Sequence, residues 1–68
     1  MKERSYIVVM QNNVPIGYVK SVSYVNGTFK ITKNKCDAKG YTKLDKLQGD
    51  IDTCAVYALN NGMMLIYD

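Results

Sequence analysis

Alternating apolar and polar residues flank the dipeptide Asn26-Gly27. Asn-Gly favours a two-residue type I′ turn, because both turn positions take positive φ angles. Counting outward from this turn pairs Val25 with Thr28 and Val22 with Ile31. One face of the predicted hairpin is then apolar and carries Val22, Tyr24, Phe29 and Ile31. We therefore expect a β-hairpin with one buried face, since a slip of one residue would turn this whole set to solvent.

The rest of the pattern predicts two further strands and sets the bounds of the two hairpin strands. Residues 6–10 are apolar on both faces, residues 11–15 have turn chemistry, and a second strand follows over 16–25 up to the Asn-Gly turn. Lys20 falls on the apolar face of this second strand, so we expect a bulge near it or a position at the rim of the sheet. The third strand covers 28–33 and the last covers 63–67.

Helical signals follow the third strand. Asn34 can cap a single helical turn that stops at a left-handed Gly40. Thr42 and Asp45 have the spacing of a capping box at the start of a longer helix. The apolar stripe of that helix is Leu44, Leu47, Ile51, Ala55 and Ala58. The Asn-Asn-Gly sequence at 60–62 ends it.

These elements predict one α+β domain over residues 1–68, with the order β-β-β-α-β. A helix between the third and last strands predicts a right-handed crossover, with the last strand parallel to the first. The first strand, apolar on both faces, is the natural neighbour of the last. We therefore expect a four-stranded, mostly antiparallel sheet with spatial order 4-1-2-3, one main helix on one face and the lysine-bearing third strand at an edge.

Composition limits the functions open to this chain. With 68 residues, 47% hydrophobic and 22% charged, it is expected to be a small soluble domain with a limited core. Its apolar runs are too short to cross a bilayer and no signal peptide pattern opens it, so we expect a cytoplasmic location. Cys36 and Cys54 are expected to be free thiols.

No catalytic, cofactor or metal site is predicted. The chain has no histidine, so acid–base chemistry would fall to aspartates such as Asp45, Asp50 and Asp52. We expect these on the outer half of the helix with ordinary pKa values. Neither cysteine has a base partner, and the glycines do not cluster into a phosphate-binding loop. We therefore expect a protein that is not an enzyme and holds no cofactor.

Three surfaces are candidates for binding. The helix side opposite Leu47 and Ile51 is a candidate protein-binding surface, with Lys46, Asp50, Thr53, Val56 and Tyr57. A basic row is a candidate nucleic-acid surface, with Lys30, Lys33, Lys35, Lys39 and Lys43. The row lacks interleaved aromatic residues for base stacking, and the net charge is only +3. The third candidate is the sheet face away from the helix, where Ile7 and Val9 are expected, with possible companions Val19 and Val25; it favours a homodimer or a docked partner.

Three stretches of the chain resemble short early-region proteins of temperate phages of Gram-positive bacteria, staphylococcal phages in particular. They are GYVKS at 17–21, NGTFKITKNK at 26–35 and DAKGYTKLD at 37–45. The shared pattern is a strand, a glycine turn, a strand, an Asp-Ala-Lys turn and a Thr-x-Leu-Asp helix start. The resemblance covers about residues 6–48 and identifies no functional residue. It implies an early phage gene near replication and recombination functions, where short proteins often bind and inhibit host or defence machinery.

We therefore expect a non-catalytic viral protein that binds a host or defence protein and inhibits or modulates it, anti-CRISPR activity included. One alternative is an accessory nucleic-acid-binding protein of phage replication or recombination. Another is a homodimeric structural protein of no separable activity. Mimicry of DNA is disfavoured, because it needs a strongly acidic surface and this chain carries a net charge of +3.

Overall fold

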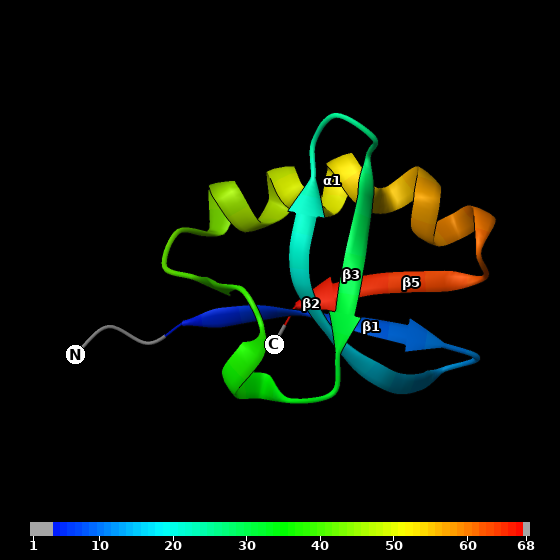
Figure 1. Ribbon diagram of the computed structural model, residues 1–68, viewed down its shortest axis with the longest axis horizontal. Helices are drawn as coiled ribbons and strands as arrows, with labels where there is room; N and C mark the ends of the chain where they lie inside the picture. The colour runs from blue at the N-terminus through cyan, green and yellow to red at the C-terminus, as the bar shows by residue number, and fades with distance from the viewer. Residues whose placement is uncertain (1–3, 68) are drawn as a thin grey trace.

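The computed structural model describes residues 4–67, which form a curled sheet with one long helix on it (Figure 1). The strands are β1 (Ser5–Gln11), β2 (Val14–Ser23), β3 (Thr28–Thr32), β4 (Gly40–Tyr41) and β5 (Met63–Tyr67). The helices are the 3₁₀-helix η1 (Lys35–Asp37) and the α-helix α1 (Leu44–Asn60). The predicted α+β class is confirmed, and β4 is an additional two-residue strand that the sequence pattern did not indicate.

All strand pairings are antiparallel. The strand β2 lies between β3 and β1, and β1 also pairs with β5. The predicted neighbours are therefore confirmed, with the last strand beside the first and β3 at an edge.

The predicted parallel orientation of the last strand is wrong, and no crossover of that kind forms. After β3, residues 33–43 lead the chain through η1 and β4 to the end of the molecule where β1 begins (Figure 1). There β4 pairs with Ser5 and Tyr6. From this end α1 runs in the direction of β1, so β5 returns antiparallel to it.

The first hairpin turn lies where it was predicted, within residues 11–15, and the second turn differs from the prediction. Asn12 and Asn13 have φ angles of 54° and 64° and join Gln11 to its partner Val14, so the two-residue turn with two positive φ angles lies here. The other hairpin has a four-residue loop over 24–27, in which only Gly27 has a positive φ, 66°.

The longer loop shifts the predicted register of the β2–β3 hairpin by two residues. Val22 pairs with Phe29 rather than with Ile31. Because the shift is even, the inward and outward faces near the turn are kept. The expected bulge is confirmed at Lys20, which lies between the pairs Val19–Ile31 and Ser21–Lys30. The extra residue lets Val19 and Val22, on either side of the bulge, both face the core while Lys20 stays exposed.

The core lies between the sheet and α1. Its buried apolar side chains are Ile7, Val9, Val19, Phe29, Tyr41, Leu47, Cys54 and Ala58. The expectation that Ile7, Val9 and Val19 face away from the helix is therefore wrong, and Val25 lies in the exposed hairpin loop. The alternate residues of β1, Tyr6 and Val8 among them, lie on the opposite face of the sheet, called the outer face below.

The helix α1 begins without the predicted cap. Its first turn follows Lys43, no side chain caps it, and Thr42 makes no capping bond. The buried side of α1 is Leu47, Asp50, Cys54 and Ala58, so Leu44 and Ala55 of the predicted stripe lie at the surface. The predicted end is confirmed, since α1 stops at Asn60 and Gly62 has a positive φ. Of the helices described, none is long and apolar enough to cross a membrane.

The short helical turn is confirmed in part. Asn34 caps η1, where its side chain accepts a hydrogen bond from the backbone N–H of Cys36 at 3.0 Å. The predicted left-handed stop at Gly40 is wrong, because Gly40 is extended within β4 and the turn ends at Ala38.

Candidate functional site

Within the described residues, Asp50 is the charged residue that is buried, with 3% of its surface exposed. It lies in the middle of α1 and accepts hydrogen bonds from three side chains outside the helix. Tyr24 of the hairpin loop donates to Oδ1 at 2.7 Å, and Tyr41 of β4 donates to Oδ2. Lys39 Nζ lies 3.2 Å from Oδ2 and 3.2 Å from the Tyr24 hydroxyl.

The surroundings of Asp50 favour one protonation pattern. Burial by itself would raise the pKa of Asp50, but the hydrogen bonds from Tyr41, Tyr24 and Lys39 outweigh it and hold this pKa below its ordinary value. Burial and the bonded carboxylate both raise the pKa of Tyr41. Burial opposes the charge of Lys39, yet its bonds to Tyr24 and Asp50 raise its pKa above the ordinary value. The expectation of a solvated Asp50 with an ordinary pKa is therefore wrong.

The Asp50 cluster has the geometry of a structural cross-link. Its charge-assisted hydrogen bonds join α1 to the hairpin loop and to β4, which are distant from each other in sequence. In the described part of the chain, every buried side-chain nitrogen or oxygen has a hydrogen-bond partner. The cluster therefore fixes three elements against one another.

Both cysteines are free, as predicted, and they differ in exposure. Cys36 lies exposed in η1, whereas Cys54 is buried in α1 with its Sγ 3.7 Å from the backbone oxygen of Thr28. Burial, followed by the charge of Asp50, raises the pKa of the Cys54 thiol. Over residues 4–67, no group of three Cys, Asp or Glu side chains is placed to hold a metal ion.

The helix residues predicted to bind a protein do not share one exposed side. They are Lys46, Asp50, Thr53, Val56 and Tyr57. Asp50 is buried, and Thr53 and Tyr57 are half-buried. The ring of Tyr57 packs edge-on against Phe29 at 5.3 Å between centroids, which gives it the structural role that the sequence did not reveal. Lys46 and Val56 remain exposed.

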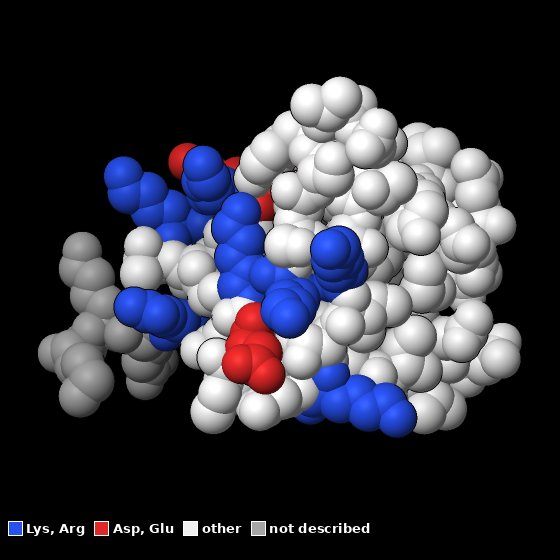
Figure 2. Space-filling model, viewed as in Figure 1, with Lys and Arg blue, Asp and Glu red and all other residues white. Residues whose placement is uncertain are grey.

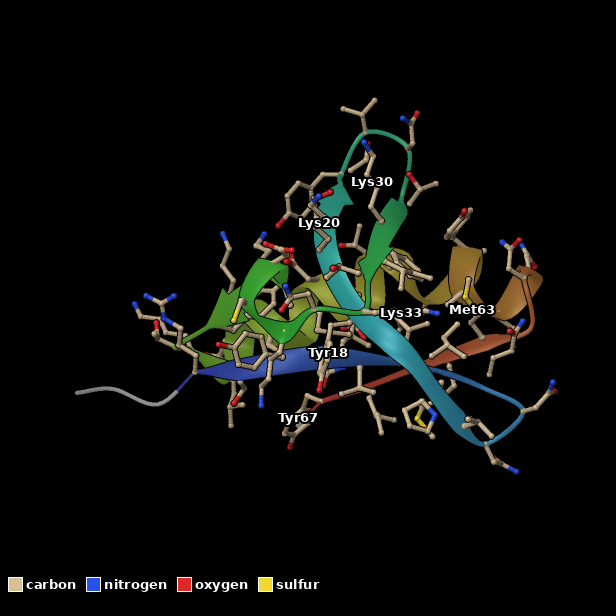
Figure 3. The ribbon with its side chains drawn as sticks, turned by 60° about the horizontal axis from the view of Figure 1, so that its bottom comes forward. Tyr18, Lys20, Lys30, Lys33, Met63 and Tyr67 are labelled. Carbon is tan, nitrogen blue, oxygen red and sulfur yellow. The ribbon has the colours of Figure 1, made fainter. Side chains whose placement is uncertain are left out.

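The predicted row of lysines is divided among four places in the fold. Its members are Lys30, Lys33, Lys35, Lys39 and Lys43. Lys39 is bonded to Asp50, Lys35 Nζ lies 5.0 Å from the ring centroid of Tyr6, and Lys43 precedes α1. Lys30 and Lys33 lie on the β2–β3 hairpin, where the bulge adds Lys20 to them (Figure 3). Three lysines thus share this hairpin.

A shallow hollow of about 500 Å³ lies beside these hairpin lysines. Val8, Ile16, Tyr18 and Lys33 are among the residues that line it. Tyr18 also packs edge-on against Tyr6, with 6.3 Å between ring centroids. An aromatic side chain therefore lies close to a lysine on the outer face, which the sequence interpretation had not foreseen.

Most charged residues lie in one part of the chain, residues 20–52, and Arg4 directly precedes β1. Residues 5–19 and residues 53–67 are two runs of fifteen residues without Lys, Arg, Asp or Glu. The pairing of β1 with β5 brings these two runs together. We call them the uncharged half and residues 20–52 the charged half. In the view of Figure 2 the charged side chains lie over the left and centre and along the lower edge of the molecule, with none at its right-hand end.

The uncharged half exposes large apolar side chains. They are Val14, Val56, Leu59, Met64, Ile66 and Tyr67. Exposed apolar residues without charged neighbours are typical of the centre of protein–protein interfaces, where methionine and tyrosine are also enriched. The sequence interpretation named only Val56 of this set, although the signal for the surface, two long charge-free runs, is present in the sequence.

Comparison with known proteins adds no family to this description. The chain matches no family model, and neither a curated protein nor a solved structure matches it. The functional argument therefore depends on the geometry of this chain, and the resemblance to phage proteins stays a prediction.

Proposed function

We propose that this chain is a non-catalytic protein-binding module that docks on its target through the uncharged half. The observation that carries the proposal is the meeting of two charge-free runs, 5–19 and 53–67, on one half of the molecule. Six large apolar side chains are exposed there. A partner that covers them gains free energy from apolar burial and removes no unpaired charge from water.

The target class comes from the resemblance to early phage proteins. It suggests a host or defence protein in the bacterial cytoplasm, which this chain would inhibit or modulate by occupying its surface. Docking of this kind requires no catalytic group, no cofactor and no metal. The exposed positions of α1, Val56 and Leu59, offer a rigid helical part of the docking surface.

Two matched substitutions test the proposal. Val56→Lys places a charge in the uncharged half, at a residue that is 68% exposed, and Val25→Lys makes the same change in the hairpin loop, where the residue is 96% exposed. Because both side chains lie at the surface, each variant should keep its unfolding free energy within about 0.5 kcal/mol of the parent.

The assay is retention of proteins from a nuclease-treated bacterial lysate by the tagged chain. The proposal predicts a protein that the parent and Val25→Lys retain and that Val56→Lys loses. Equal retention by all three proteins would contradict it. Retention that is seen only in a parallel lysate without nuclease would favour a nucleic-acid bridge instead.

Nucleic-acid binding is a second candidate function, favoured by the outer face of the hairpin. Lys20, Lys30 and Lys33 lie there with Tyr18 at the base of the hairpin (Figure 3). Lysines of this kind contact phosphates, and a tyrosine can stack on a base. Because only three lysines share the hairpin, we expect weak, non-specific binding with a Kd of about 10⁻⁴ to 10⁻⁶ M at physiological salt.

A further inference from the structure

The edges of the sheet differ in their protection against pairing with another strand. At one edge β3 carries Lys30, Lys33 follows it, and a bulge lies in the adjacent β2. The strand β4 is only two residues long. These are the features by which soluble proteins prevent edge strands from pairing.

The strand β5 has none of these features. Among the described strands it pairs with β1 alone, through five consecutive pairs without a bulge. Its residues Met63–Tyr67 include no charge and no proline. Met64 and Ile66 are 62% and 41% exposed. An unprotected, regular and apolar edge strand is a template for pairing with another strand.

An apolar groove borders this strand. It has a volume of about 260 Å³, lies between α1 and β5, and is lined by residues that include Ala55, Leu59, Met63 and Leu65. Ala55 and Leu59 are exposed, so the helix leaves room beside the strand. A strand added to β5 would cover the apolar walls of this groove as well as pair with the backbone.

We propose that β5 pairs along its free edge with β5 of a second copy of this chain. The inference rests on the proposed function, because it names a partner for one part of the uncharged half. Charge directs the contact of two copies to the uncharged half: each copy carries a net +3, and contact there keeps residues 20–52 of the two copies apart. The small size of the domain also favours pairing with a second copy, because the pairing extends a small hydrophobic core.

The sequence of β5 is self-complementary in antiparallel pairing. A two-fold axis at Leu65 places Met64 opposite Ile66 of the second copy, and Met63 opposite Tyr67. Every pair in this register is apolar. Directly opposed residues share one face of an antiparallel sheet, so Met64 and Ile66 cover each other on the outer face. The two sheets then form one continuous sheet.

Sedimentation of the full chain over about a hundredfold range of concentration tests this inference. We expect the parent to approach twice the 7.7 kDa mass of one chain. Met64→Lys combined with Ile66→Lys opposes like charges in both equivalent pairs, so the dimer Kd should rise about 100-fold or more. Met64→Lys combined with Ile66→Glu opposes unlike charges in the same register and should keep the dimer.

The outcomes separate the inference from the proposed function. A parent that sediments as a monomer at every concentration overturns the inference. Equal dimer affinities of the two double variants also overturn it, because residues 64 and 66 would then not face each other across the dimer. Circular dichroism checks that all three proteins are folded. A monomer that loses its target on Val56→Lys overturns only the second-copy inference. A dimer whose Val56→Lys and Val25→Lys variants retain the same proteins contradicts only the proposed function.

Discussion

The charged and uncharged halves share one sheet but differ in which side chains they bury and which they expose. In the charged half the carboxylate of Asp50 is buried with three partners, and most lysines lie at the surface. In the uncharged half the interior is packed by apolar side chains such as Ile7 and Val9, and large apolar side chains are exposed beside uncharged polar ones. One small domain can thus concentrate charge in the region where a buried carboxylate supports the fold and build the other region almost entirely from uncharged residues.

The largest expected effect removes the buried charge of the charged half. Asp50→Ala leaves Lys39, Tyr24 and Tyr41 without their shared acceptor, so we expect a loss of about 3–5 kcal/mol in the free energy of unfolding. Urea unfolding measures it. Asp52→Ala is the matched control, because Asp52 is exposed on the same helix, and it should change stability by less than about 0.5 kcal/mol. Similar losses in both variants would show that the buried position of Asp50 does not make it more important for stability than an exposed aspartate.

Asp50 should also make the free energy of unfolding depend on pH, and this effect is smaller than that of removing its side chain. The pKa of Asp50 is lower in the folded chain than the value of about 3.9 in an unfolded one, so its contribution is fully present above that value. It is lost as pH falls through the folded-state pKa, because the folded carboxylate then gains a proton. Urea unfolding between about pH 6 and pH 2 should therefore show the advantage of the parent over Asp50→Asn shrinking below about pH 4. Parallel pH profiles would be evidence against this linkage.

Substitution of Gly27, in the hairpin loop of the charged half, should destabilise the fold. Gly27 has a φ of 66°, and a Cβ there would lie 3.4 Å from the backbone oxygen of Thr53 in α1. Gly27→Val should therefore destabilise the fold by about 1–3 kcal/mol. Asn26→Val is the control, because its φ is not positive, and it should cost much less. Denaturant melts with equal midpoints for the two variants would show that the loop conformation does not depend on this glycine.

The smallest expected effect concerns the lysines of the β2–β3 hairpin. If nucleic acid binds there, Lys30→Gln combined with Lys33→Gln should lower the log–log salt slope by about 1.8 on duplex DNA, since each contact contributes about 0.9. Anisotropy of a labelled oligonucleotide across a salt series measures the slope. Lys43→Gln combined with Lys46→Gln is the control and should leave it unchanged. Nanomolar binding that the first pair of substitutions abolishes would make the charged half the functional one.

Local patterns predicted most elements of the fold. The hydrophobic alternation located the hairpin strands, the Asn-Asn-Gly sequence ended α1, and the apolar first strand identified the neighbour of β5. The bulge at Lys20 was predicted because a lysine cannot occupy an apolar face at low cost. Each of these signals lies within a few residues of the feature that it specifies.

The errors arose where distant residues decide local structure. The loop over 24–27 is longer than Asn-Gly suggests, and Tyr24 within it bonds to Asp50, 26 residues away. The burial of Asp50 itself depends on side chains from the hairpin loop and the segment before α1. The two-residue strand β4, too short to have a pattern, precedes the helix whose course makes β5 antiparallel. The candidate site was missed because it is defined by an absence of charge rather than by a motif.

The two free cysteines, one exposed and one buried, allow opening of the core to be measured directly. A thiol reagent reaches the exposed Cys36 in the native state, whereas Cys54 is shielded between α1 and the backbone of β3. The first modification therefore needs no structural change, and the second must wait until α1 separates from the sheet. The delay between modification of Cys36 and modification of Cys54, followed by mass spectrometry, measures how often the helix separates from the sheet, without any engineered label.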